Sequence, residues 1–290
     1  MTTTVPPARR TGPAARWRHR RLARSPLGLL AWGVLALFVL VLVAGPWVVP
    51  VDPLAQDSEA LLPWGSAGHL LGTDELGRDV LSRVLTGGRP LLVVSIGSAV
   101  AAAALGTVLG LLAGYCGGVV DSLVMRVVDV LLAFPLVLVA ILMVAVLGGG
   151  TTNTLIAITV SQVPFCARLV RNLTLAQVNL DYVRSARALG TAGPVIAVRE
   201  VLPNLVGPLL VNTTSSLAVT AGLSSALSYL GLGQDASSPD WGYMVRSGQE
   251  LIFSNPSLAL LPGLLITVFA VAANLAGDDL RDAVDTGGAA

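Results

Sequence analysis

The stretch "LLVVSIGSAVAAAALGTVLGLLAGY", residues 91–115, runs without a single charged side chain. A helix of about 20 apolar residues crosses the ~30 Å hydrocarbon core of a bilayer, where the backbone must satisfy its own hydrogen bonds. The composition of the whole chain agrees, because 54% of its 290 residues are hydrophobic, 12% are charged and the mean hydropathy is +0.77. The sequence therefore predicts an all-α membrane protein.

Five further apolar runs flank this stretch, and together they predict six transmembrane helices. The other five expected spans are residues 25–49, 127–147, 152–167, 205–230 and 258–275. The first run follows an arginine-rich segment but is too long for the apolar part of a signal peptide, and no small-residue cleavage site ends it. We therefore expect a membrane domain over residues 25–280.

Charge asymmetry predicts the orientation of these spans. Residues 1–24 hold seven arginines and no acid, and residues 168–200 are also arginine-rich, whereas residues 50–88 and 233–255 are net acidic. Because cytoplasmic segments carry an excess of basic residues, we expect the first two inside the cell and the last two outside. Six spans then place both termini in the cytoplasm, with 281–290 as a cytoplasmic tail.

The outer segment contains "GTDELGRDVLSRVLTGG", residues 72–88, which has the pattern of an amphipathic helix. Thr73 or Asp74 is the expected N-cap, and the acidic residues of the first turns suit the positive end of the helix dipole. Gly87 and Gly88 are expected to end the helix.

A polar interruption, "DYVRSARALGTAGPVIAVREVLPN", occupies residues 181–204 between two apolar runs. Asp181 is the expected N-cap of a short first helix, which Gly190 ends in the left-handed conformation. Pro194 suits the first turn of a second short helix that runs to Val201.

The resulting hairpin would lie on the cytoplasmic side, with Pro203 at its junction with the next span. Tyr182, Ala186 and Leu189 would share one helix face, and Arg184 and Arg187 another. An apolar face of this size cannot bury itself. It lies either on the lipid surface, which composition alone favours, or in a groove of another protein.

The segment resembles the cytoplasmic EAA motif of ABC importer permeases: Glu-Ala-Ala, three residues, glycine, and about ten residues later Leu-Pro. Here Arg184, Ser185 and Ala186 precede Gly190 at the family spacing, and Leu-Pro follows at 202–203. Arg184 stands where the family has glutamate, and Ser185 replaces the first alanine.

Three more stretches resemble the dipeptide, oligopeptide and nickel permeases, and specifically their second, C-type subunit. They are "HLLGTDELGRDVLSRVLTGGR" (69–89), "DSLVMRVVDVLLAFPLVLVAI" (121–141) and "ALSYLGLGQDASSPDWGYM" (226–244). The resemblance implies the type I ABC importer permease fold in a bacterial cytoplasmic membrane. It also implies a heterodimer with a homologous permease, two ATPase subunits that bind ATP and Mg, and an extracellular solute-binding protein.

By the same resemblance, helix 181–189 is the coupling helix that sits in a groove of an ATPase subunit, within a coupling segment 171–203. The implied coupling residues are Asp181, Tyr182, Arg184, Ser185, Ala186, Arg187, Leu189, Gly190 and Pro203. The expected solutes are di- or oligopeptides imported by alternating access, with nickel chelates or glutathione as alternatives.

The sequence offers no candidate for catalysis, cofactor or metal binding, or nucleic-acid binding in this chain. It lacks the G-x-x-x-x-G-K-[ST] pattern of nucleotide-binding loops, its histidines have no ligands at metal-binding spacing, and its net charge is only +1. We therefore predict a transport subunit and not an enzyme.

Asp129 is the only acid inside a predicted span, and such acids often relay protons or ions. It motivates a rival hypothesis, an ion-coupled secondary transporter, with a passive membrane scaffold as a third class. Arg126 lies three residues earlier, so we favour a structural ion pair on the helix surface.

A polar stripe in the fifth predicted span leaves two interpretations open. Its members recur every four residues: Asn212, Ser216, Thr220, Ser224 and Ser228. Small polar residues line water-filled pathways, but they also allow helices to pack closely in membranes.

Overall fold

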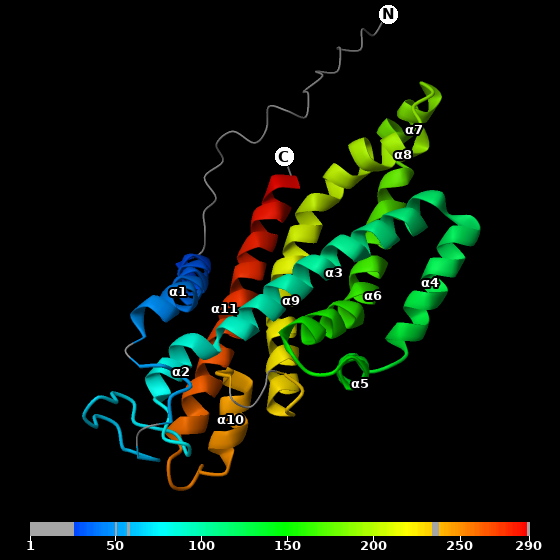
Figure 1. Ribbon diagram of the computed structural model, residues 1–290. Helices are drawn as coiled ribbons and strands as arrows, with labels where there is room; N and C mark the ends of the chain where they lie inside the picture. The colour runs from blue at the N-terminus through cyan, green and yellow to red at the C-terminus, as the bar shows by residue number, and fades with distance from the viewer. Residues whose placement is uncertain (1–25, 50, 57–58, 234–237, 289–290) are drawn as a thin grey trace, which may run out of the picture.

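The computed structural model describes residues 26–49, 51–56, 59–233 and 238–288, and the regular elements in these ranges are helices (Figure 1). The arginine-rich segment 1–24 lies outside the described residues, so the prediction for it stays a prediction. Five helical stretches are long and apolar enough to cross a membrane. Their principal helices are α1 (Pro26–Val48), α3 (Arg89–Cys116), α6 (Thr151–Val178), α9 (Leu202–Tyr229) and α11 (Ser257–Gly288).

The third predicted span, 127–147, is not one straight helix. Two helices, α4 (Gly118–Leu132) and α5 (Leu136–Leu147), meet at an angle of 90° and together can make one broken crossing. Pro135 explains the break, since it lacks a backbone donor and forces the residue before it away from helical geometry. The prediction of six spans holds only with this bent pair counted as one.

Two predicted helices were too short at their C-terminal ends. The helix expected over 152–167 continues as α6 to Val178, so Arg168 and Arg171 lie within it rather than beyond its end. The helix expected over 258–275 continues as α11 to Gly288, so most of the predicted tail is helical.

The predicted amphipathic helix at 73–88 begins only at Val80, as α2 (Val80–Gly87). Asp74 is not an N-cap, because its side chain accepts hydrogen bonds from the backbone N–H groups of Leu76 and Arg78 in a turn. Asp79 caps the helix instead, accepting from the N–H of Ser82 at 2.7 Å. The amphipathic pattern extends N-terminal to the helix, into a segment that local side-chain hydrogen bonds hold in a turn.

Buried charges fasten this loop to α2. The side chains of Arg78 and Arg83 are each only 2% exposed. Arg78 Nε donates to Asp74 Oδ2 at 2.7 Å, and Arg83 NH1 donates to the carbonyl of Pro53. Buried guanidinium groups require such partners, so the network fixes the segment that precedes α2.

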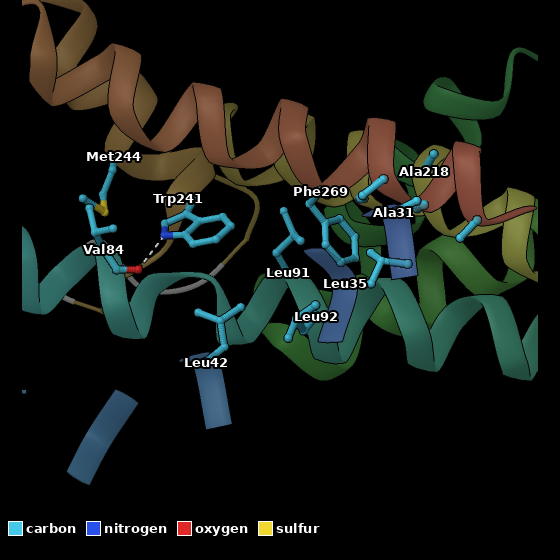
Figure 2. Close-up of a cluster of buried hydrophobic side chains, with 14 of the residues drawn as sticks. Ala31, Leu35, Leu42, Val84, Leu91, Leu92, Ala218, Trp241, Met244 and Phe269 are labelled. Carbon is cyan, nitrogen blue, oxygen red and sulfur yellow. Dashed lines mark hydrogen bonds between the residues drawn. The ribbon is translucent and has the colours of Figure 1, made fainter. Parts of the chain in front are cut away.

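A hydrophobic core joins α1, α2 and α11 to the short helix α10 (Trp241–Gln249). Its central side chain is Trp241, whose Nε1 donates to the carbonyl of Val84 at 2.9 Å (Figure 2). Phe38 packs edge-to-face against both Trp241 and Phe269. Gly88 lies beside this ring with φ −82°, and a Cβ there would approach Trp241 to 2.6 Å. Close packing, and not a left-handed turn, therefore requires this glycine.

Among the described helices, α3 and α6 share the most extensive contact, and three glycines one turn apart lie in it. A Cβ added at Gly106 would lie 2.5 Å from Cβ of Cys166. At Gly110 it would lie 2.5 Å from the carbonyl oxygen of Ala167. At Gly114 it would lie 2.7 Å from Thr174. Small residues at this spacing let helix backbones touch in a membrane, and we call this contact the glycine seam.

Several helix ends gather at the end of the molecule that carries the 181–203 hairpin (Figure 1). Trp32, near the start of α1, donates from its indole to Asp279, near the end of α11. Gly207, near the start of α9, lies against Val284 of α11. The opposite end carries α10 and the loop before α2. The start of α1 and the end of α11 thus lie at one end, as an even number of crossings requires.

Gly110→Ala should destabilise the protein by about 1–3 kcal/mol, because the new methyl group cannot enter the glycine seam without separating α3 from α6. The melting temperature in detergent measures this. Gly222→Ala is the matched control, since a Cβ at this helical glycine of α9 meets no other atom within 4 Å. Equal melting temperatures for the two variants would contradict the close contact.

Candidate functional site: the 181–203 hairpin

The hairpin begins with α7 (Asp181–Ala188), which follows directly on α6. Asp181 is not its N-cap: that position belongs to Leu180, and the Asp181 side chain is fully exposed. Its carboxylate lies 3.9 Å from the guanidinium of Arg184 one turn later, a loose surface pair.

Gly190 ends α7 in the predicted left-handed conformation, with φ +77°. Its N–H donates to the carbonyl of Arg187, and the N–H of Thr191 donates to the carbonyl of Ala186 at 3.1 Å. This pair of bonds is the Schellman motif. A Cβ at Gly190 would meet nothing within 4 Å, so the backbone angle alone restricts this position.

The second helix does not stop at Val201. Helix α8 (Gly193–Ile196) passes into a π-helical turn at Ala197–Val201 and from there into α9 without a break. The N–H of Leu202 reaches back five residues to the carbonyl of Ala197. Pro203 lies in the first turn of α9, and the wider π turn just before it accommodates a proline ring that would clash in a regular helix. The predicted junction is therefore a continuous helix and not a separate turn.

The inner face of the hairpin is built into the base of the membrane helices. Val183, Ile196 and Val201 are fully buried, and they pack in one cluster with Val170 of α6 and Leu205 of α9. The predicted apolar face of Tyr182, Ala186 and Leu189 was wrong in part: Leu189 is 85% exposed, as a docking residue requires, but Ala186 packs inward against this cluster. An i, i+3 pattern that starts at Val183 would have found the buried face.

Tyr115, at the end of α3, was missed by the sequence analysis. Arg187 lies over its ring at 5.5 Å from the centroid, an arrangement that favours a cation. A Cβ on Gly193 would approach the same ring to 3.3 Å. Tyr115 thus touches both arms of the hairpin. An aromatic residue at the polar end of an apolar run was the available signal.

Tyr182 also faces the body of the protein. Its hydroxyl donates to Gln177 Oε1 at 2.7 Å and accepts from Asn204 Nδ2 at 3.3 Å, which links the end of α6 to the start of α9. Partial burial raises the pKa of Tyr182, so the hydroxyl stays protonated and able to donate.

The outer face of the hairpin is exposed and partly apolar. The Leu189 side chain is joined there by three others that sequence analysis did not single out: Leu180, Val195 and Val198. Arg184, with a side chain 66% exposed, and Ser185 lie on the same exposed stretch. We call this set the docking face. An exposed apolar surface with an arginine beside it suits contact with a partner or with a membrane surface.

The polar stripe in α9 does not meet the hairpin and divides into two parts. Thr220, Ser224 and Ser228 are buried inside the chain. Thr220 donates to the carbonyl of Ser95 on α3, and Ser228 donates to Asp240 Oδ2. Asn212 and Ser216 are half-buried.

Asp129 has a different partner from the predicted one. It pairs with Arg168 of α6 and not with Arg126 on its own helix. The bend after α4 brings the helix alongside α6, so the partner comes from a distant part of the chain. An ion pair satisfies the acid and gives no support to an ion relay.

Two family models match this chain. Residues 106–287 match the family model described as binding-protein-dependent transport system inner membrane component. Residues 16–63 match the N-terminal TM domain of oligopeptide transport permease C.

Two curated relatives extend over nearly the whole chain. The glutathione transport system permease protein GsiD of Pectobacterium atrosepticum is 38% identical over 98% of this chain and 96% of its own. The di/tripeptide transport system permease protein DppC of Pseudomonas aeruginosa is 41% identical over 93% and 90%. A solved structure of the MetNI methionine ABC transporter, inward facing, shares the fold with a TM-score of 0.55 and 20% identity. That match covers 68% of this chain and 94% of the other.

Tyr115→Ala should loosen the hairpin without unfolding the membrane helices, since it removes the ring beneath Arg187 and beside Gly193. A cation–π contact is worth about 0.5–1 kcal/mol, so backbone amides of 182–200 should exchange hydrogen roughly two- to fivefold faster. Hydrogen exchange with mass spectrometry measures this. Tyr115→Phe keeps the ring and should match the wild type. Unchanged exchange in Tyr115→Ala would show that the ring does not hold the hairpin.

Proposed function

Because the chain belongs to the family of binding-protein-dependent transport system inner membrane components, we propose that the 181–203 hairpin is where ATPase subunits drive it. The protein is a membrane permease subunit of an ABC importer. It is not itself an enzyme, since ATP hydrolysis in such importers occurs on separate subunits. ATP and Mg are therefore expected on those partners.

One observation carries the proposal: the inner face of the hairpin packs against the membrane helices, and its outer face is exposed. Val183 and Ile196 are fully buried against the membrane helices, while Leu189 and Val198 expose most of their surface. A hairpin that only rested on lipid would not need a rigid connection to three spanning helices. A joint that transmits force requires such a connection.

The connections define how motion would pass into the membrane. Helix α6 enters the hairpin, α9 leaves it through the π turn, and Tyr115 ties it to α3. Closure of the ATPase subunits on ATP would move the docking face and, with it, the inner ends of these helices. Such rigid-body movement would switch the pathway between outward and inward access.

Arg184 sets the charge expected of the partner. It stands on the exposed side of α7 together with Ser185, and Asp181 lies beside it in a loose pair. The groove of the ATPase subunit should therefore present an acidic or neutral wall at this point. Arg184→Glu would place like charges together there and weaken docking.

The proposed solutes are di- and tripeptides. Relatives are named for di/tripeptide and for glutathione transport, and glutathione is itself a tripeptide, so one solute chemistry fits both names. We propose that a homologous permease completes the pathway in a heterodimer, with two ATPase subunits below and an extracellular solute-binding protein above. Nickel chelates are the less favoured alternative.

Of the five residues of the polar stripe in α9, only two remain proposed to line the solute pathway. Thr220, Ser224 and Ser228 are buried within the subunit, which supports a packing role. Asn212 and Ser216 are half-buried and remain the proposed lining residues of the stripe.

Gly190→Val should uncouple the complex. A β-branched residue at φ +77° costs about 1–2 kcal/mol, so the hairpin would turn differently and displace the docking face. In proteoliposomes with the complete importer, peptide uptake should fall while ATP hydrolysis continues without its response to the loaded binding protein.

Gly190→Asn is the matched control, because asparagine tolerates the left-handed conformation and the site has room for its side chain. It should retain most of the coupling. If Gly190→Val couples as well as the wild type, the hairpin is not the transmission element, and the lipid-surface interpretation applies.

The proposed orientation has its own test in intact cells. With Cys116 and Cys166 replaced by serine or alanine, Ser66→Cys should react with a membrane-impermeant maleimide and Gly287→Cys should not. Ser237→Cys, in the second acidic segment, should react as Ser66→Cys does. The reverse pattern would invert the topology and place the hairpin outside, away from any cytoplasmic ATPase.

A further inference from the structure

Helix α4 is loosely packed for a helix inside a bundle. The structure describes all of it, and Val128 is its one buried residue. Five of its other large apolar side chains are exposed, among them Val119 at 74%, Leu123 at 65% and Val127 at 62%, and the remaining four are half-buried. Apolar packing within this subunit therefore holds α4 only weakly.

Two ion pairs hold α4 to α6 instead. Arg171 makes a two-pronged contact with Asp121, from Nε to Oδ1 at 2.6 Å and from NH2 to Oδ2 at 2.5 Å. Arg168 pairs with Asp129 further along. The first pair is the better shielded, with side chains 28% and 20% exposed against 48% and 59% in the second. A forked guanidinium–carboxylate contact fixes direction as well as distance.

Arg171 occupies a particular place on α6. Its backbone lies against the glycine seam, where a Cβ at Gly110 would come within 2.8 Å of its nitrogen and one at Gly114 within 2.9 Å of its oxygen. Two turns later α6 ends and the hairpin begins. The backbone at Arg171 must therefore move with α3, α6 and the hairpin as one body, while its side chain reaches α4.

At the C-terminal end of α4 the helix is broken. Helix α4 leads through the break at 133–135 into α5, which packs against α6 and α9. A force applied at Asp121 would thus turn α4 about this break. Nothing else in α4 offers α6 a directional contact, apart from the more exposed Arg168–Asp129 pair.

We propose that Asp121 and Arg171 are positioning residues that carry movement of the 181–203 hairpin from α6 to the bent α4–α5 pair. This inference rests on the proposed function of the hairpin as the ATPase joint. It assigns the broken crossing a role as a driven element of the gate, moved through an ion pair and not through apolar packing.

The test uses the complete importer in proteoliposomes and measures peptide molecules taken up per ATP hydrolysed. Asp121→Asn and Arg171→Gln should each lower this ratio about five- to tenfold, with the assembled complex recovered in normal amount. The charge swap Asp121→Arg with Arg171→Asp should restore it to within about threefold of wild type. Arg126→Gln, on the same helix but outside both ion pairs, is the matched control and should leave the ratio unchanged.

Three results would overturn the proposal. A normal ratio in both single variants would show that the pair carries no movement. A proportional loss of uptake and hydrolysis, or of assembled complex, would show a purely structural anchor. Failure of the charge swap to restore the ratio would show that the contact between the two side chains is not what matters.

Gly190→Val distinguishes failure of the proposed ion-pair role from failure of the proposed function of the hairpin. If that variant stays coupled, the role of the hairpin fails. If it uncouples while Asp121→Asn does not, only the role of the ion pair fails.

Discussion

The glycine seam between α3 and α6 is the contact on which the rest of the structure depends. At Gly106, Gly110 and Gly114 a methyl group would lie within 2.7 Å of an atom of the facing helix, so the two backbones touch over two turns. Without a hydrophobic driving force between helices in lipid, close backbone contact of this kind is a principal source of association. It gives the hairpin a rigid base, because α6 ends in the hairpin and α3 supplies Tyr115 beneath it.

From that base the molecule divides into a rigid part and a part held by polar contacts. The hairpin, α6, α9 and the end of α3 share the buried cluster around Val183 and Ile196. Helix α4 is attached mainly through charges, and its ion pairs lie at the edge of this rigid part. An arrangement of this kind suits an importer permease, since a driven element must stay connected while its packing changes.

Sequence analysis predicted the spans, the hairpin and the positive φ of Gly190, because apolar length and a glycine after a short helix are local signals. It was wrong about Asp129, because the partner, Arg168, comes from another helix. It was also wrong about Asp181, because α7 starts one residue earlier and its N-cap is Leu180. The bend at Pro135 and the missing first turns of α2 reflect local chemistry that an apolar pattern conceals. The glycine spacing at 106–114, the aromatic Tyr115 at the end of an apolar run and the i, i+3 pattern from Val183 were readable signals that the analysis did not use.

The central claim is that the docking face meets a protein and not lipid. The most direct measurement places a photoreactive amino acid at Leu189, 85% exposed in this subunit, within the complete importer in native membranes. After irradiation, mass spectrometry identifies the cross-linked product. We expect adducts with an ATPase subunit, reduced when ATP is withheld or when Arg184 is replaced by glutamate. Adducts confined to phospholipid, with none to an ATPase subunit, would contradict the claim.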